Sequence, residues 1–470
     1  MIFLPLLFVL YWFVVNKNLK AQNTLLAIAS YIFYGWWDWR FLTLIFFSSA
    51  VDYCIGLTLG KTTTKSKRKI LLSISLIANL GVLGFFKYFN FFIDSFIDFF
   101  QSMGIHLNET SLNLILPVGI SFYTFQTLSY TIDIYRNKLQ PTRDVVSFFA
   151  FVSFFPQLVA GPIERASNLL PQFQTKRQFH LEQAKDGMRQ ILWGLFKKIV
   201  VADNIGAKVD VIFANPGAFS GIDLFIGVFL FTIQIYCDFS GYSDIAIGTA
   251  RLFGFNLMRN FAYPFFSRNI GEFWQRWHIS LSTWFRDYLY IPLGGSKKGK
   301  AKQISNALIT FTVSGFWHGA NWTFVFWGFL NGLYFLPLIL QRKGKKHKKY
   351  TQIVAHDRML PTPTEAIKIL ATFLLFMFSI VFFRSVNIGA ALDYLGMVFT
   401  HEWLIRPTYL KPLIPCFIVL LVEWLQRRKP HALDLAHLPW PLRWAAYYIV
   451  FFGILAFGNF GEKAFIYFQF

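Results

Sequence analysis

The sequence predicts an all-α, polytopic helical membrane protein. Hydrophobic residues make up 55% of the chain and charged residues only 15%, whereas a soluble domain carries about 25% charged residues. The longest stretch without Asp, Glu, Lys or Arg runs from Gln303 to Gln341. It is long enough for two membrane spans at roughly 20 residues each. A bilayer is therefore the expected solvent for most of the chain.

Shorter uncharged stretches recur along the rest of the chain. They cover residues 1–15, 70–86, 111–132, 224–237, 369–383 and 445–461. Several need flanking residues to cross a bilayer, so we expect about ten spans together with re-entrant segments. The first stretch has no basic segment before it and no small-residue cleavage site after it. We therefore expect it to be a retained span and not a signal peptide.

Basic residues are in excess and lie in short clusters between the apolar stretches. The chain has 45 Lys and Arg against 24 Asp and Glu, a formal net charge of +21. Clusters at 61–69, 342–349 and 427–429 are candidate cytoplasmic loops by the positive-inside rule. Such clusters suit anionic membrane lipids as partners and give no support to nucleic acid binding.

We expect a single membrane-embedded domain over residues 1–470. The longest polar segment, 341–364, begins with a basic run and is predicted to be a loop inside this domain, because spans on both sides of it must pack together. The three cysteines are far apart and form no Cys-x-x-Cys pair, so neither a disulfide framework nor a structural zinc site is predicted, and no metal is expected.

Residues 271–291 are too charged to span a membrane but carry apolar residues at helical spacing. Trp274, His278, Leu281 and Phe285 would lie on one face of a helix. The segment predicts one amphipathic helix at the membrane interface, with His278 pointing inward. A histidine that only hydrogen-bonds in a packed core is the alternative.

The sequence lacks G-x-S-x-G, H-E-x-x-H and P-loop motifs, so a catalytic group has to be sought inside the membrane. The strongest candidate there is His318. It is the one side chain in the long uncharged stretch that can become charged near neutral pH, and an ionisable residue at bilayer depth is a functional-site hypothesis by default. A neutral imidazole can act as a general base. Hydrogen bonding between helices, and haem or metal ligation, remain the alternatives.

The neighbours of His318 suit a substrate channel. Gly315 and Gly319 would permit close approach to the backbone, and Asn321 offers a hydrogen-bonding amide. Trp317 and Trp322 would supply apolar walls for a thioester.

Two further polar segments follow apolar stretches. Asp238–Asp244, which includes Ser240 and Tyr242, follows residues 224–237, and Asp133–Arg136 follows 111–132. Each is predicted either to be a helix end with a paired carboxylate or to line a polar cavity. Pro156–Arg165 holds two prolines and a glycine, so it is not one straight helix, and a re-entrant loop is expected.

Six segments of the sequence resemble the membrane-bound O-acyltransferase family, and within it the bacterial branch of alginate O-acetyltransferases. They are Pro117–Gln126, Phe155–Glu164, Asp238–Asp244, Phe273–Ser282, Arg286–Gly295 and Gly315–Gly319. The resemblance covers almost the whole chain. It implies that His318 is the essential histidine and that His278 is the second polar residue of the site. It also implies a bowl-like helical bundle with a central channel, to which we assign Asp238, Ser240, Tyr242, Trp317 and Asn321 as candidate lining residues.

The resemblance further implies acetyl transfer in a bacterial cytoplasmic (inner) membrane. Acetyl-CoA would be the donor substrate, with no bound cofactor, and a polysaccharide would be the final acceptor through an extracytoplasmic SGNH-type acetyltransferase partner. D-alanyl transfer to teichoic acid and O-acetylation of peptidoglycan are the alternatives within this fold. A transporter, the alternative from another class, predicts inverted repeats, and the sequence shows no repeat.

Overall fold

The computed structural model describes residues 2–107, 112, 114–159, 161–341, 352–403, 410–461 and 465–466. These residues form helices and loops and no strand, which confirms the all-α prediction. Their contacts divide the chain into two compact units, one of residues 1–187 and 249–258 and one of residues 188–248 and 259–470. The single-domain organisation over residues 1–470 stays a prediction.

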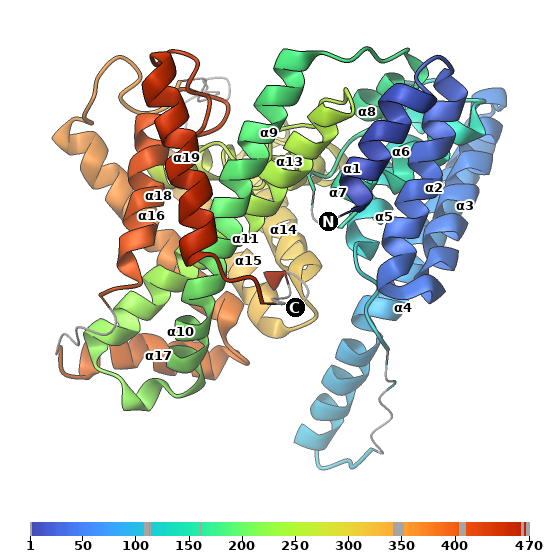
Figure 1. Cartoon of the computed structure of the whole chain (residues 1–470). Coiled ribbons are helices and arrows are strands. Elements are labelled where there is room, and N and C mark those ends of the chain that lie inside the picture. The colour runs from blue at the N-terminus through green and yellow to red at the C-terminus, as the bar shows by residue number, and fades with distance from the viewer. Residues whose placement is uncertain are drawn as a thin grey trace. The chain divides into compact units, whose positions relative to one another are not determined.

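The first unit contains the N-terminal helices (Figure 1). They are α1 (Phe3–Val9), π-helix η1 (Leu10–Val14), α2 (Leu19–Asp38), 3-10 helix η2 (Trp39–Phe41), α3 (Leu42–Lys61), α4 (Lys65–Ser102), α5 (Ile120–Tyr135), α6 (Val145–Ser153), α7 (Phe155–Leu158), α8 (Ala166–Gln174) and the first part of α9 (Leu181–Leu195).

Hydrogen bonds between buried polar side chains join α3, α4 and α5. Ser75 Oγ donates to Asp52 Oδ1 at 2.5 Å, and Asn79 Nδ2 donates to Asp52 Oδ2 at 3.0 Å. Ser75 Oγ also lies 3.2 Å from Thr131 Oγ1 on α5. Such bonds hold helices together where apolar surface alone gives no preference for protein over lipid.

Residues 156–165 are not one helix, as predicted from their prolines. Helix α7 ends at Leu158, and non-helical chain from Gly161 leads to Arg165, the residue before α8. The Glu164 carboxylate accepts bonds from Asn168 Nδ2 at 2.7 Å and from the backbone N–H of Met258.

The second unit contains the remaining helices. They are the rest of α9, π-helix η3 (Phe196–Ala202), α10 (Asp203–Ala214), 3-10 helix η4 (Pro216–Ala218), most of α11 (Gly221–Leu252), 3-10 helix η5 (Pro264–Phe266), α12 (Ile270–Trp274), α13 (Ile279–Phe285), π-helix η6 (Arg286–Tyr290), α14 (Gly299–His318), α15 (Trp322–Leu340), α16 (Pro363–Arg384), α17 (Ile388–Thr400), α18 (Leu413–Leu425) and α19 (Trp440–Phe457).

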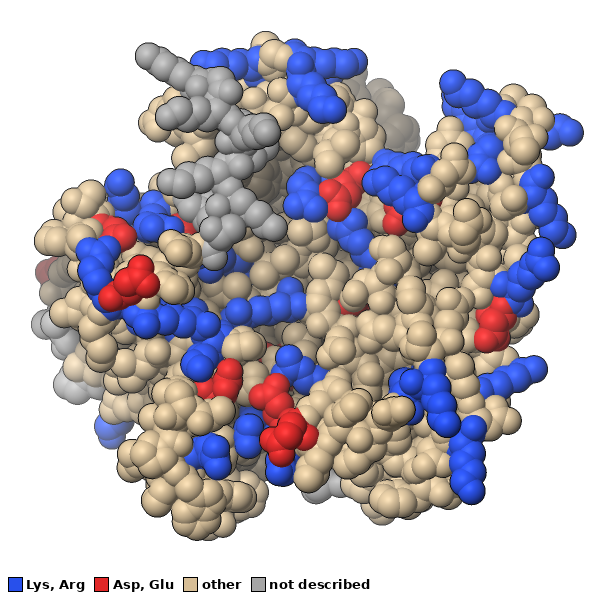
Figure 2. Space-filling model, turned by 90° about the horizontal axis from the view of Figure 1, so that it is seen from above, with Lys and Arg blue, Asp and Glu red and all other residues tan. Residues whose placement is uncertain are grey.

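Among the described residues, six helical segments are long and apolar enough to cross a membrane. They are 19–61, 65–102, 221–252, 322–340, 363–384 and 440–457, and shorter apolar helices cover 3–14, 388–400 and 413–425. The expected first span is one of the shorter helices, and a total of about ten spans stays a prediction. On the face shown in Figure 2, Lys and Arg side chains lie among many uncharged residues.

The long uncharged stretch, predicted to hold two spans, contains most of helix α14 and all of α15, and of these two α15 is among the six candidate spans. Glycines bring them together, because a Cβ added at Gly315 would lie 2.2 Å from Phe324 O, and one at Gly328 would lie 2.3 Å from Phe311 O. Small residues of this kind allow close contact between helices. The turn between the two helices begins directly after His318, the last residue of α14.

The prediction of one amphipathic helix over 271–291 is wrong. Helix α12 ends at Trp274, and α13 starts only after His278, which has a left-handed backbone with φ of 42°. The neighbouring loop forms hydrogen bonds with backbone groups that a continuous helix would pair within itself. Ala262 N donates to Arg276 O at 2.9 Å, and Ile279 N donates to Asn260 O at 2.9 Å. The predicted inward face is confirmed, because the four residues proposed to form it are all buried.

Candidate active site

His318 ends α14 in a pocket of aromatic rings and is only 4% exposed. Its ring centroid lies 5.0 Å from the ring of Trp317, 5.2 Å from Trp327 and 5.4 Å from Phe383. These side chains come from α14, α15 and α16. The His318 ring is therefore packed against three aromatic rings from three helices.

His278 lies next to His318, so the structure brings the two predicted histidines together. Their ring centroids are 6.4 Å apart, with 61° between the ring planes. His278 is completely buried, and its ring lies nearly perpendicular to that of Phe239 on α11, with 4.6 Å between the centroids. Burial lowers the pKa of His278 to about 3, so that this ring is neutral near pH 7.

The environment of Asp238–Asp244 differs from the predicted helix end. Helix α11 continues without a break from Gly221 to Leu252, so the segment lies inside a long apolar helix. Asp238 Oδ1 lies 2.5 Å from Lys198 Nζ, and its Oδ2 accepts a bond from Ile466 N at 2.7 Å. The Tyr242 ring lies 5.5 Å from the same ammonium group. The polar segment stays helical because cations from η3 compensate its charges.

A second lysine binds the same helix one residue earlier in η3. Lys197 Nζ lies 2.7 Å from Asp244 Oδ2 and donates to Ser240 Oγ at 2.8 Å. The two lysines reach α11 because two glycines allow close approach. A Cβ added at Gly241 would lie 2.8 Å from Gly194 O, and one at Gly194 would lie 2.6 Å from Gly241 O.

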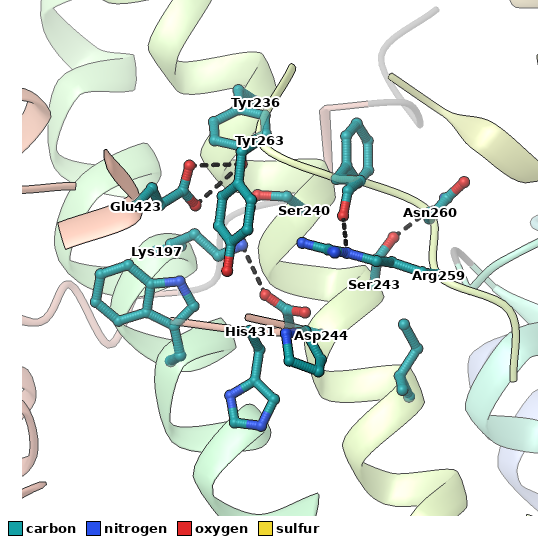
Figure 3. Close-up of a pocket in the computed structure, with 14 residues that line it drawn as sticks. Lys197, Tyr236, Ser240, Ser243, Asp244, Arg259, Asn260, Tyr263, Glu423 and His431 are labelled. Carbon is teal, nitrogen blue, oxygen red and sulfur yellow. Dashed lines mark hydrogen bonds and ion pairs between the residues drawn. The ribbon is translucent and has the colours of Figure 1, made fainter. Parts of the chain in front are cut away.

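A polar pocket lies beside this part of α11 (Figure 3). It is lined by Trp193, Lys197, Tyr236, Ser240, Ser243, Asp244, Ile247, Arg259, Asn260, Phe261, Tyr263, Glu423, Pro430 and His431. The cavity alternative thus holds for Ser240 and Asp244, whereas Asp238 and Tyr242 are not among the lining residues. Asn260 belongs both to this pocket and to the histidine pair, because its Oδ1 lies 3.1 Å from His278 Nδ1.

Asn321 makes hydrogen bonds, as expected of its amide, and its place in the channel stays a prediction, whereas Trp322 does not provide the expected wall. Asn321 caps α15, with its Oδ1 accepting from Thr323 N at 2.9 Å and its Nδ2 donating to Val386 O at 3.1 Å. Trp322 is 57% exposed, so it does not form a wall of a buried channel. Trp317, by contrast, packs against both histidine rings, at 5.0 Å from His318 and 6.1 Å from His278.

Sequence reasoning missed several polar residues that line the pocket, among them Lys197, Asn260 and Glu423. Glu423 is the single charged residue of the apolar helix α18, and both of its carboxylate oxygens lie within 2.9 Å of Tyr236 OH. An isolated charge in such a run is a signal that would have found Glu423. Lys197 stands directly beside Lys198 in the sequence, so it does not give the same signal. Asn260 gives no such signal.

Among the described residues, no three His, Cys, Asp or Glu side chains come close enough to hold a metal ion. These features define a polytopic helical membrane protein. It contains two adjacent buried histidines and, close to them, buried lysines that are paired with carboxylates.

Comparison with known proteins identifies the family. The sequence profile of the membrane-bound O-acyltransferase family matches residues 142–360, which include both histidines. The chain is 40% identical over 405 residues to "Probable alginate O-acetylase AlgI" of Pseudomonas syringae pv. tomato, a match that covers 85% of this chain and 74% of the relative. It is 36% identical to the "Peptidoglycan O-acetyltransferase" of Helicobacter pylori, over 84% of this chain and 78% of the relative.

A more distant match, at 27% identity, is the "Teichoic acid D-alanyltransferase" of Streptococcus thermophilus, over 63% of this chain and 75% of the relative. The chain belongs to the membrane-bound O-acyltransferase family, and it is a multi-pass membrane O-acyltransferase. Family membership does not support the transporter alternative.

Proposed function

We propose that this enzyme moves an acetyl group from acetyl-CoA, supplied on the cytoplasmic side, towards a polysaccharide outside the bacterial cytoplasmic membrane. The observation that carries the proposal is the buried pair of histidines whose ring centroids are 6.4 Å apart. The higher identity to an alginate O-acetylase, 40%, than to a teichoic acid D-alanyltransferase, 27%, supports acetyl over D-alanyl transfer.

In the proposed reaction, His318 acts as the general base. It removes the proton of the acceptor hydroxyl while that oxygen attacks the thioester carbonyl, and the tetrahedral intermediate then expels the CoA thiolate, which takes up the proton. General base catalysis of this kind contributes typically 10²–10⁴-fold. The aromatic walls formed by Trp317, Trp327 and Phe383 limit access of water, which would otherwise hydrolyse the thioester.

The other candidate residues take supporting roles in this proposal. His278 orients the acceptor beside His318. Ser240 and Trp317 border the substrate path, whereas Asp238 and Tyr242 act through Lys198. Asn321 fixes the start of α15 and hence the turn after His318.

The direction of transfer follows from the basic loops. The loops at 61–69 and 342–349 would be cytoplasmic by the positive-inside rule and would attract anionic lipids and the anionic donor. The second of these loops lies outside the described residues. An extracytoplasmic SGNH-type acetyltransferase would then receive the acetyl group and pass it to the polysaccharide.

The test is transfer of label across a membrane. Proteoliposomes of defined orientation receive radiolabelled acetyl-CoA on the side of the 61–69 loop and, on the other side, polymannuronate together with the SGNH-type partner encoded near the gene. Wild type should label the polysaccharide. His318→Ala should keep less than about a tenth of that rate. His401→Ala is the matched control, because its half-buried ring binds the Phe219 carbonyl and lies outside the histidine pair.

Two results would count against the proposal. If His318→Ala retains most of the activity, His318 is not the general base. If transfer occurs only when donor and acceptor are on the same side, the cross-membrane route is wrong. A second candidate, O-acetylation of peptidoglycan, is favoured by the 36% identity to the Helicobacter pylori enzyme. Label that enters peptidoglycan fragments and not polymannuronate would select it.

A further inference from the structure

The orientation of the Asn260 amide is fixed by a neighbouring backbone group. Asn260 is completely buried, and its Oδ1 lies 3.3 Å from Ser280 N and 2.9 Å from Ser280 Oγ. A backbone N–H can only donate, so the amide atom that faces it must be the oxygen. The amide nitrogen then points to Ser243 Oγ at 3.2 Å, as Figure 3 shows. The usual ambiguity between the two ends of an amide side chain is thereby removed.

This orientation determines the tautomer of His278. The same Asn260 Oδ1 lies 3.1 Å from His278 Nδ1, and an oxygen that only accepts requires a proton on that nitrogen. In a neutral imidazole the other nitrogen, Nε2, then carries a lone pair. The ring is neutral, because burial lowers the pKa of His278 to about 3.

The Nε2 atom is buried and has no hydrogen-bond partner among the described residues. Buried polar atoms of proteins are nearly always bonded, so an exception marks a place for a ligand or a water. The His318 ring lies on one side of His278, with the two centroids 6.4 Å apart. Because Nε2 carries a lone pair, its hydrogen-bond partner must be a donor, such as a hydroxyl or an amide N–H.

We propose that Asn260 is a positioning residue that holds His278 as the Nδ1–H tautomer, so that Nε2 accepts a hydrogen bond from a hydroxyl or N–H group of the bound substrate. The backbone supports this role, because Ile279 N donates to Asn260 O at 2.9 Å and fixes the loop against the left-handed turn at His278. In this tautomer His278 cannot donate to a developing oxyanion. It orients the acceptor through Nε2, which is the part of the inference that rests on the proposed function.

Nuclear magnetic resonance of ¹⁵N-histidine-labelled protein in detergent micelles tests the tautomer directly. The signals of His278 are assigned by their loss in His278→Gln. Wild type should show a protonated Nδ1 and an unprotonated Nε2 at pH 7.5. Asn260→Leu, which removes the acceptor, should release the ring into a mixture of tautomers, whereas Asn260→Asp, which keeps an acceptor oxygen, should leave Nδ1 protonated.

Activity adds the second readout. Asn260→Leu should lower kcat by roughly 3- to 10-fold, the loss expected for one ordinary hydrogen bond, and Asn260→Asp should be faster than Asn260→Leu. Asn331→Leu is the matched control. It removes another completely buried amide of the same unit, whose Nδ2 donates to Trp327 O of its own helix at 2.9 Å, and it should keep the wild-type tautomer.

A protonated Nε2 in the wild type, or an unchanged tautomer in Asn260→Leu, would overturn the proposal. If Asn260→Leu does not fold, the wild-type and Asn260→Asp spectra still decide it. If the spectra are as expected but Asn260→Leu and His278→Gln both keep full activity, Asn260 does set the tautomer of His278, and the role of His278 in acyl transfer is refuted. Failure of the proposed function is therefore distinguishable from failure of the positioning role.

Discussion

Replacing Lys198 should destabilise the second unit far more than neutralising Asp238, its partner on α11. The Lys198 ammonium lies 2.8 Å from Asp203 Oδ1 and 2.5 Å from Asp238 Oδ1, and all three side chains are at most 9% exposed. Lys198→Met leaves two buried carboxylates beside each other without a cation. Removing one partner of a buried ion pair costs about 3–5 kcal/mol.

Asp238→Asn leaves the charges better balanced, because Lys198 still pairs with Asp203. The amide oxygen can also still accept the bond from Ile466 N, which is 2.7 Å long in the wild type. We therefore expect a loss of about 1 kcal/mol, the value of one ordinary hydrogen bond. The double variant Lys198→Met/Asp238→Asn should be more stable than Lys198→Met alone, since it buries one unpaired carboxylate and not two.

Thermal unfolding in detergent, followed by tryptophan fluorescence and by recovery of monodisperse protein after heating, measures all four proteins. Acyl transfer is assayed on the same samples. Equal destabilisation by the two single variants would refute the sharing of Lys198 between Asp238 and Asp203, because Asp238→Asn would then leave the ammonium group unpaired. If Asp238→Asn is stable but inactive, Asp238 instead belongs to the substrate path, as the sequence had suggested.

Two further predictions concern the helix contact and the buried histidine. Gly241→Ala should lower both thermal stability and activity, because its Cβ would lie 2.8 Å from Gly194 O of α9 and 3.2 Å from Lys198 N of η3 and would push both from α11. Gly396→Ala in α17, where an added Cβ meets nothing within 4 Å, is the matched control and should have no such effect. The ¹⁵N signals of His278 should not shift between pH 8 and pH 5, because its pKa is about 3, and a titration in that range would disprove the burial effect. Because the unfolded ring has a pKa near 6.5, the unfolded state takes up the proton first, and wild type should lose stability relative to His278→Gln as pH falls below about 6.5 towards 3.

The sequence was sufficient to predict those parts of the fold whose signal is local. The uncharged stretch from Gln303 to Gln341 gave both α14 and α15, with His318 close to its centre and at the turn between them. The prolines of Pro156–Arg165 marked a break that the structure contains. Both predicted histidines are buried and adjacent, although the sequence separates them widely.

Other features depend on contacts between distant segments and were missed for that reason. The polar run at Asp238–Asp244 looked like a helix end, because nothing near it in sequence pairs with its carboxylates. The pairing lysines belong to η3, some forty residues earlier in the chain. In the same way, the break at His278 is made by backbone bonds to the loop at Asn260 and Ala262, which no helical periodicity can reveal.

The two kinds of polar group in this unit have different physical requirements, and Asn260 lies between them. The charges of Lys197, Lys198 and their carboxylate partners tolerate burial because each cation contacts an anion within 2.8 Å. His278 has no such ionic partner among the described residues and lies among aromatic rings, so its ring stays neutral. The tautomer of a neutral ring decides which of its nitrogens can accept a hydrogen bond. A carboxylate at this position would also hold the proton on Nδ1, but it would raise the pKa of His278. The chemistry proposed for this enzyme therefore requires an acceptor at residue 260, and the uncharged amide of asparagine supplies one without favouring a charged ring.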